Sequence, residues 1–134
     1  MDILVLDDNR EFAQSLAALI TQMGHRVSIS HDCATARRLA EAQPFDVIFA
    51  DVELPDGDGR HACEGLRMTG ASQEAFMIAL TGRTELGDND FPGFEGYMRK
   101  PVTYEPLERV LEEWRVALGL PKGTPANQVV TREA

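Results

Sequence analysis

The sequence comprises 134 residues, of which 43% are hydrophobic, and it carries a formal net charge of -9. This length and composition suit one compact domain with a hydrophobic core and leave no room for a second domain of ordinary size. The negative charge argues against non-specific binding to nucleic acid and against docking on an anionic membrane, since both depend on Lys and Arg side chains. The expected partners are proteins or cations.

The start of the chain and the absence of a long apolar run lead us to expect a cytoplasmic protein. The opening "MDILVLDDNR" turns acidic after four apolar residues, unlike a secretory signal, and no apolar run is long enough to span a membrane. Cys33 and Cys63 lack the spacing of a metal site or a redox pair. We expect both cysteines to be small buried or half-buried residues.

Five short segments have the composition of β-strands. Three of them are apolar and rich in β-branched side chains, which suits parallel strands that are buried on both faces. A fourth strand is expected between the first two helices, and a short fifth strand near residue 97. In chain order the predicted strands are 2–6, 26–30, 46–50, 76–80 and 96–98.

Helical patterns alternate with these strands. Apolar side chains recur on one face over residues 12–23, Gly24 is a stop signal, and Asp32 is a candidate N-cap for the next helix. A third helix is expected over about residues 59–68. The last helix has Thr103 as its candidate N-cap and an apolar stripe formed by Leu107, Val110, Leu111, Trp114 and Leu118.

Two segments depart from the alternation. Residues 82–96 contain four glycines and a proline where a fourth helix would run, so we expect a loop or at most one or two helical turns. Residues 119–134 contain two prolines, two glycines and no apolar periodicity. They are expected to form a flexible tail or linker stub after a domain that spans residues 1–118.

The alternation predicts a doubly wound α/β fold with a five-stranded parallel sheet and right-handed crossovers. In such sheets the ligand site lies beyond the carboxyl ends of the strands. That rule selects the polar residues at the predicted strand ends as candidate site residues, namely Asp7, Asp8, Asp51, Thr81 and Lys100.

The carboxylates among these residues indicate a cation site. Three carboxylates in a small volume repel one another unless a divalent cation or raised pKa values relieve the repulsion, and Mg²⁺ combined with phosphate oxygens points to phosphoryl chemistry. Lys100 and Thr81 would hold the oxygens of a phosphoryl group on Asp51. The alternatives are that Asp7 and Asp8 only cap the first helix, that Lys100 is a solvated turn residue and that Thr81 is structural.

The set of motifs resembles the receiver domain of response regulators in two-component signalling, over residues 1 to about 118. The motifs are "DD" at Asp7 and Asp8, "D-x-x-x-P" at 51–55, "TG" at Thr81 and "Y-x-x-K-P" at 97–101. Each motif is weak alone, and the set in this order is specific. The resemblance implies the flavodoxin-like strand order 2-1-3-4-5.

The resemblance also implies the roles of the acidic residues. Asp51 would accept a phosphoryl group from a histidine kinase or phosphotransfer protein and form an acyl phosphate, in chemistry that rests on positioning and charge neutralisation. Mg²⁺ would be bound directly by Asp8 and Asp51, through water by Asp7, and by the backbone carbonyl of Glu53. A calcium loop over 51–62 is a poor interpretation because Pro55 occupies a ligand position.

Further roles follow from the same resemblance. Thr81 and Lys100 would bind the phosphoryl oxygens, the Lys100–Pro101 peptide bond is expected to be cis, and Thr81 and Tyr97 would act as switch residues. Glu53 and Arg83 stand at positions that tune the lifetime of the phosphoryl group. They are either an ion pair across the site or two solvated charges.

Two hypotheses concern the rest of the chain. The resemblance implies an output face made by the fourth helix, the fifth strand and the last helix, and the helix-breaking residues 82–96 indicate that this face is remodelled. We predict that phosphorylation orders or repositions these residues. The three histidines, His25, His31 and His61, share no motif and are expected at the surface.

The favoured function is a phosphorylatable single-domain receiver or receiver module of a phosphorelay, which signals through protein contacts as a monomer or a phosphorylation-dependent dimer. It would promote its own phosphorylation and dephosphorylation without acting as an enzyme on a separate metabolite. One alternative is a Mg-dependent phosphatase, although the nucleophile strand has "DVE" in place of D-x-D. Another is an interaction module that works without phosphorylation.

Overall fold

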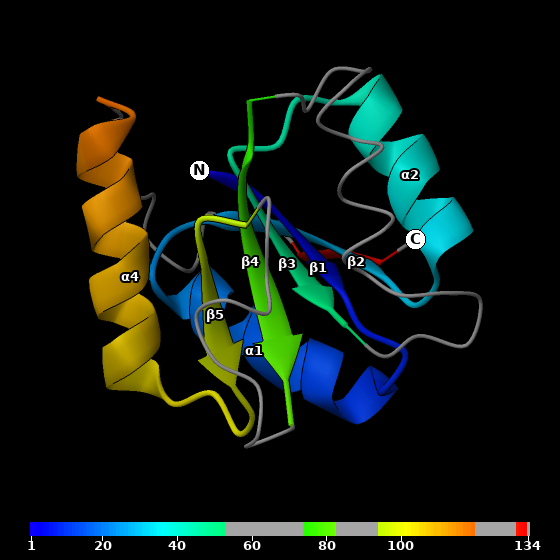
Figure 1. Ribbon diagram of the computed structural model, residues 1–134, viewed down its shortest axis with the longest axis horizontal. Coiled ribbons are helices and arrows are strands. Elements are labelled where there is room, and N and C mark those ends of the chain that lie inside the picture. The colour runs from blue at the N-terminus through cyan, green and yellow to red at the C-terminus, as the bar shows by residue number, and fades with distance from the viewer. Residues whose placement is uncertain (53–73, 83–93, 120–130, 134) are drawn as a thin grey trace.

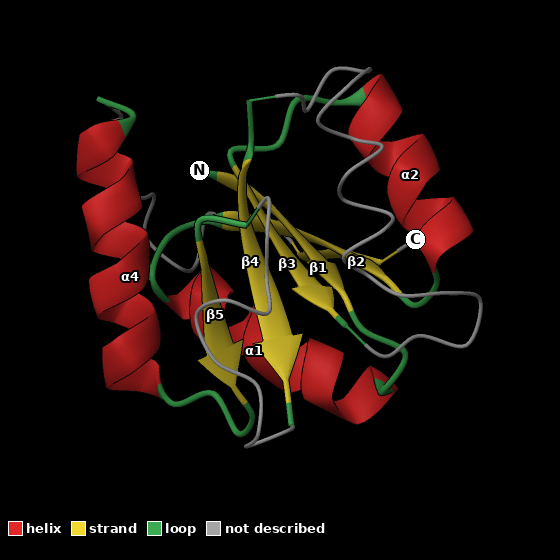
Figure 2. Ribbon diagram, in the orientation of Figure 1, coloured by secondary structure: helices red, strands yellow, loops and turns green. Residues whose placement is uncertain are grey.

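The computed structural model describes residues 1–52, 74–82, 94–119 and 131–133. Strands and helices alternate along the first part of the chain, as Figures 1 and 2 show. The strands are β1 (Asp2–Leu6), β2 (Arg26–Ser30), β3 (Val47–Asp51), β4 (Phe76–Thr81), β5 (Gly96–Arg99) and β6 (Thr131–Glu133), and the helices are α1 (Arg10–Gln22), α2 (Cys33–Ala42) and α4 (Tyr104–Ala117).

Within the described residues, six parallel strands form one sheet in the order β5-β4-β3-β1-β2-β6. The predicted α/β fold and the order 2-1-3-4-5 of its five strands are confirmed. Parallel neighbours place the carboxyl ends of β1, β3, β4 and β5 at one edge of the sheet. This edge carries the candidate site.

The sheet is covered on both faces. Side chains of a strand alternate between the faces, so Ile3 and Val5 of β1 pack on the side of α1 and α4, whereas Leu4 and Leu6 pack on the side of α2. This two-sided burial is the reason that β1, β3 and β4 are apolar except for one polar residue at an end of each strand. Figure 1 shows α1 behind the sheet, with α4 and α2 at opposite sides of the view.

The N-cap residues of α1 and α2 can be compared with those that the sequence suggests. Asn9, and not Asp7 or Asp8, is the N-cap of α1, and its side chain accepts a hydrogen bond from the backbone N–H of Phe12 at 3.0 Å. The interpretation that Asp7 and Asp8 only cap this helix is therefore wrong. Asp32 caps α2 as predicted, by accepting from the N–H of Thr35 at 2.7 Å.

The start of α4 lies where the sequence predicts it. Thr103 occupies the N-cap position with extended backbone angles, but its side chain makes no capping hydrogen bond within the described part of the chain. The predicted apolar stripe is the buried face, because Leu107 and Leu111 are fully enclosed and Val110 and Trp114 pack beside them. Trp114 also contacts the ring of Phe76 with centroids 5.7 Å apart.

Strand β6 was not expected from the sequence. Thr131–Glu133 pairs with β2 in the register Val27↔Thr131, Ser28↔Arg132 and Ile29↔Glu133, whereas the whole of 119–134 was predicted to be a flexible tail. Three residues carry no periodicity that a sequence pattern can detect. The pairing depends on the unpaired backbone groups that the edge of β2 offers, which only the folded sheet creates.

Several predictions lie outside the described residues. They are the helix over 59–68, the loop or short helix over 83–93, and the positions of His61 and Cys63. Cys33 is described, and it is a buried free cysteine at the start of α2, as expected. None of the described helices combines the length and apolar character needed to cross a membrane.

The prediction of surface histidines is wrong for His25. Its exposed fraction is 5%, and Nδ1 lies 3.1 Å from the α-amino nitrogen of Met1. Burial, followed by repulsion from the Met1 ammonium, lowers the pKa of His25 from 6.5 to about 4. His25 lines a pocket together with Leu111 and Glu112 of α4, a proximity of distant segments that the local sequence around His25 does not reveal.

A pH-dependent loss of stability follows from this burial. The pKa of His25 is lower in the folded chain than in the unfolded chain, so the unfolded state binds more protons as the pH falls from 6.5 towards 4. Between pH 7.5 and pH 5 the wild type should lose about 2 kcal/mol more unfolding free energy than His25→Gln. Urea denaturation at both pH values measures the difference, and parallel losses in the two proteins would contradict the assignment.

Candidate functional site

Four neighbouring strands bring the candidate residues together at one edge of the sheet. Asp7 follows β1 directly, Asp51 and Thr81 are the last residues of β3 and β4, and Lys100 follows β5. The registers Asp51↔Leu80 and Thr81↔Arg99 place these strand ends level with one another. The structure places these four residues at one edge of the sheet.

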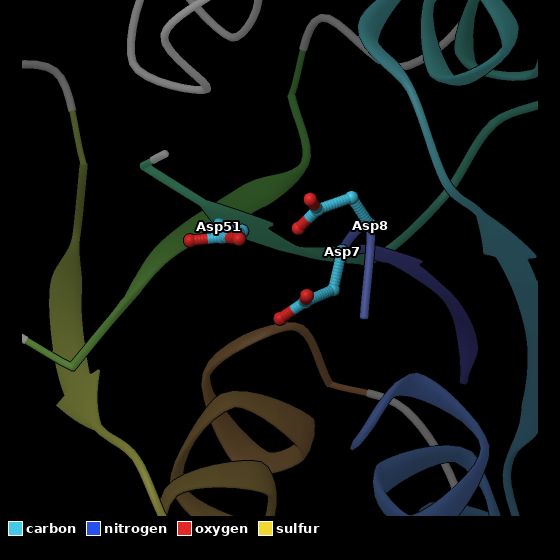
Figure 3. Close-up of side chains that lie close together, drawn as sticks. All are labelled: Asp7, Asp8 and Asp51. Atoms are coloured by element: carbon cyan, nitrogen blue, oxygen red, sulfur yellow. The ribbon is translucent and has the colours of Figure 1, made fainter. Parts of the chain in front are cut away.

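Three carboxylates form the acidic part of the site. One oxygen from each of Asp7, Asp8 and Asp51 lies within 4.8 Å of the others. Asp7 is fully buried, Asp51 is 5% exposed and Asp8 is open to solvent. Figure 3 shows Asp7 and Asp8 leaving the end of β1 on the side that faces Asp51. Such a cluster combines two enclosed carboxylates with one through which a hydrated cation can approach.

Lys100 supplies positive charge to this cluster. Its ammonium nitrogen lies 2.6 Å from Oδ2 of Asp7 and 3.5 Å from Oδ2 of Asp51. One ammonium does not neutralise three carboxylates, so the described site keeps an excess of negative charge that favours a further cation. The sequence analysis expects Lys100 beside Asp51, and the structure places its ammonium closer to Asp7 than to Asp51.

The backbone around Asp7 holds its carboxylate in place. The N–H of Asp7 donates to the carbonyl of Ser30 at 3.0 Å, and Oδ1 of Asp7 accepts from the N–H of Asn9 at 2.9 Å. Nδ1 of His31 lies 3.0 Å from the carbonyl oxygen of Asp7. These contacts link Asp7 to the carboxyl end of β2 and to the N-cap of α1, so its side chain has little freedom to move.

The environment of the second carboxylate oxygen of Asp7, Oδ2, indicates whether the site suits a metal ion. Within the described part of the chain, Oδ2 of Asp7 is buried and accepts no hydrogen bond of good geometry, although the Lys100 ammonium is in charge contact with it. A buried carboxylate oxygen without a hydrogen bond is costly unless a cation compensates it. The all-oxygen donor set and the solvent access at Asp8 fit Mg²⁺, which keeps several of its waters.

Thr81 joins the end of β4 to Lys100. The Thr81 side chain is fully buried, and its carbonyl accepts a hydrogen bond from the backbone N–H of Lys100 at 2.8 Å. The Lys100–Pro101 peptide bond is cis, as the resemblance implied. A backbone hydrogen bond therefore links Thr81 to Lys100 beside Asp51.

Tyr97 lies on β5, away from the carboxylates. Its half-buried ring packs with Val52, Ala79 and Phe94, and the guanidinium of Arg99 lies 5.4 Å from its centroid. The ring of Tyr97 therefore connects β5 with Val52, the residue that follows β3. Glu53 and Arg83, the two predicted lifetime-tuning residues, lie outside the described residues.

One residue of the site was missed in the sequence. The ammonium nitrogen of Lys100 lies 4.7 Å from the centroid of the Phe12 ring, although the helical pattern assigned Phe12 only to the core. The available signal was its position one helical turn after Asp8. That signal is weak, because an apolar residue in the first turn of an amphipathic helix is usually a core residue.

Comparison with known families identifies this arrangement. The family described as "Response regulator receiver domain" matches residues 3–112. The chain belongs to this family. Its receiver fold, its strand order and its acidic strand-end cluster are therefore those of a signalling domain of two-component systems.

Curated relatives carry this receiver domain as part of longer proteins. The chain is 29% identical over 136 residues to the signal transduction histidine-protein kinase BarA of Escherichia coli K12, covering 99% of this chain and 14% of BarA. It is 31% identical over 110 residues to the response regulator MprA of Mycobacterium avium strain 104, covering 80% of this chain and 47% of MprA. The receiver domain thus resembles modules of both sensor kinases and response regulators.

Solved structures share the fold. The receiver domain of the sensor histidine kinase PA1611 from Pseudomonas aeruginosa PAO1 is 32% identical with a TM-score of 0.77, covering 84% of this chain and 95% of that chain. That structure has a magnesium ion coordinated in its active site cleft. A CheY-like receiver domain from Methylobacillus flagellatus superposes with a TM-score of 0.78 at 23% identity, covering 85% of this chain and 98% of that chain.

Proposed function

We propose that this receiver domain is a phosphorylatable switch of two-component signal transduction in the cytoplasm. Asp51 accepts the phosphoryl group from a histidine kinase or a phosphotransfer protein. The observation that carries the proposal is the placement of the enclosed Asp51 carboxylate between two further carboxylates and the Lys100 ammonium. A plain solvated turn would not enclose a carboxylate among charges of both signs.

The metal-binding residues follow from the same cluster. Asp8 and Asp51 would bind Mg²⁺ directly, Asp7 would bind it through water, and the backbone carbonyl of Glu53 would complete the protein ligands. When bound, Mg²⁺ neutralises negative charge on the phosphoryl oxygens and the carboxylates. The magnesium in the related PA1611 receiver domain and the clustering of three carboxylates around a single ammonium support this ligand set.

The chain's own residues carry the transfer. A carboxylate oxygen of Asp51 attacks phosphorus, the bond from phosphorus to the donor breaks, and the donor leaves with the bonding electron pair. Lys100 and Thr81 then bind the phosphoryl oxygens, through the ammonium and the hydroxyl group. The backbone hydrogen bond between Lys100 and Thr81 supports the two side chains as one unit.

Signalling proceeds through protein contacts. Thr81 and Tyr97 act as the switch, residues 82–96 are ordered or repositioned on phosphorylation, and Glu53 and Arg83 tune the lifetime of the acyl phosphate. The domain acts on its own phosphorylation state and not on a separate metabolite. Its partners are a kinase or phosphotransfer protein and a downstream protein, with neither nucleic acid nor membrane, and it is a monomer or a phosphorylation-dependent dimer.

The proposed unit spans residues 1–118, followed by residues 119–134 as a tail or linker. The family match over 3–112 supports this extent, and the pairing of β6 with β2 adds a short ordered piece to the tail. The relatives BarA and MprA support a place in a phosphorelay on either side of the transfer, as a module of a kinase or of a regulator.

Phosphorylation by a small donor tests the function directly. We expect incubation with Mg²⁺ and acetyl phosphate to add a single phosphoryl group, detected by intact mass, and EDTA to prevent it. Absence of an adduct, together with failure to bind beryllofluoride, would favour an interaction module that works without phosphorylation. Sustained hydrolysis of p-nitrophenyl phosphate would favour a Mg-dependent phosphatase instead.

A further inference from the structure

Phe12 faces the ammonium group of Lys100 from α1. The nitrogen lies 4.7 Å from the ring centroid, within the range of a cation–π interaction. The ring is half-buried, and the first turn that carries it is held by the hydrogen bond from the N–H of Phe12 to Oδ1 of Asn9. The aromatic face is therefore presented to Lys100 by a capped, ordered helix start.

The ammonium has the Phe12 ring and Asp7 as neighbours at the same time. Oδ2 of Asp7 lies 2.6 Å from the nitrogen, and the oxygen of Asp51 is more distant at 3.5 Å. The side chain of Lys100 is 24% exposed, so the cation is only partly hydrated and the attraction of the ring is correspondingly strong. Both neighbours favour the position against Asp7.

This position competes with a metal ion. Asp7 Oδ2 is the buried carboxylate oxygen that otherwise has no hydrogen bond in the described part of the chain. While the ammonium compensates it, a divalent cation gains less by entering the cluster, because part of the negative charge is already neutralised. Any interaction that holds the ammonium there lowers the affinity of the cluster for that cation.

We propose that Phe12 is a positioning residue that holds the Lys100 ammonium against Asp7 and thereby weakens Mg²⁺ binding in the unphosphorylated protein. This inference rests on the proposed metal site. Phe12 lies on α1 and also packs against the hydrophobic core. Its substitution therefore also changes the packing there, and this effect must be separated from the effect on Lys100. The two effects have opposite signs, because damage to the site weakens Mg²⁺ binding whereas release of the ammonium tightens it.

Isothermal titration of the full chain with MgCl₂ tests the proposal. Phe12→Leu keeps the apolar bulk and removes the aromatic face, and we expect its Kd for Mg²⁺ to fall about two- to five-fold. Phe12→Tyr keeps the ring and should retain the wild-type Kd. Weaker or unchanged Mg²⁺ binding by Phe12→Leu would overturn the proposal, as would equal tightening by Phe12→Tyr.

A double-mutant cycle with Lys100 adds the specific control. In the Lys100→Met background Phe12→Leu should leave the Kd for Mg²⁺ unchanged, because there is no ammonium to hold. The same tightening in that background would refute a role through Lys100. Urea unfolding of each variant confirms that the titrated protein is folded.

The result is separable from the proposed function. The Kd for Mg²⁺ needs no phosphoryl donor, so a shift in Kd without any adduct from acetyl phosphate would support the role of Phe12 and contradict the phosphorylation. A phosphoryl adduct on the wild type, with no shift in the Kd of Phe12→Leu for Mg²⁺, would support the phosphorylation and contradict the role of Phe12. Absence of any Mg²⁺ binding to the wild type would overturn both.

Discussion

Replacing Asp51 with asparagine is expected to abolish the phosphoryl adduct formed with Mg²⁺ and acetyl phosphate. The amide has a similar shape, but its neutral oxygen is a poor nucleophile and cannot form the acyl phosphate. The fold should persist, because the change removes one of three clustered negative charges and leaves Lys100 paired with Asp7. Intact mass measures the adduct, and urea unfolding measures the stability.

The chain offers a matched control for this variant. Asp2 lies at the start of β1, at the opposite end of the sheet, where it pairs with Arg26 at 2.8 Å. Asp2→Asn removes the same charge from a surface ion pair and should form the adduct at the wild-type rate. An adduct that survives in Asp51→Asn would assign the phosphoryl group to another residue and contradict the proposed site.

Replacing Lys100 with methionine is expected to destabilise the protein in the absence of Mg²⁺. Methionine keeps an apolar stem and removes the charge, so the buried Asp7 carboxylate loses the ammonium at 2.6 Å. Removing one partner of a buried ion pair costs about 3–5 kcal/mol, and we expect about 2–3 kcal/mol here because Lys100 is partly exposed. Urea denaturation in EDTA measures the loss.

Mg²⁺ should restore much of the stability that Lys100→Met loses. A divalent cation in the cluster supplies the missing positive charge, and any ligand that binds the folded state alone stabilises it. The rate of adduct formation should nevertheless stay about 100-fold below wild type, because no ammonium contacts the phosphoryl oxygens. Destabilisation that Mg²⁺ does not reverse would show that Lys100 matters for packing and not for charge.

Arg26→Met is the control for a cation outside the site. Arg26 pairs with Asp2 at a distance similar to that between Lys100 and Asp7, but its side chain is 64% exposed. A surface ion pair contributes about 0–1 kcal/mol, so this variant should lose little stability and should show no special response to Mg²⁺. The difference in unfolding free energy between Lys100→Met and Arg26→Met isolates the effect of the burial of Asp7.

The site connects to the core of the sheet through short chains of contacts. Asp7 is tied by its backbone to Ser30 at the end of β2, and Thr81 is tied to Lys100 across β4 and β5. Tyr97 packs against Val52, the residue after the last residue of β3. Residues in contact thus connect the end of β3, which carries Asp51, with β5.

The sequence alone predicts the five strands β1 to β5, their alternation with helices and the polar residues that stand at the strand ends. These features could be predicted because they are local: buried parallel strands must be apolar on both faces, and the polar residue after each one marks the strand end. The N-cap at Asp32 and the apolar stripe from Leu107 to Trp114 were predicted for the same reason.

The contacts between distant segments depend on the tertiary structure. It buried His25, gave the cap of α1 to Asn9, added β6 to the edge of β2, and set the ammonium of Lys100 between Asp7 and the ring of Phe12. A sequence pattern reports which face of an element is apolar, but not which element comes to lie against it. The short-range forces that settle charge pairing and ring contacts act only once the sheet has brought those side chains within a few ångströms.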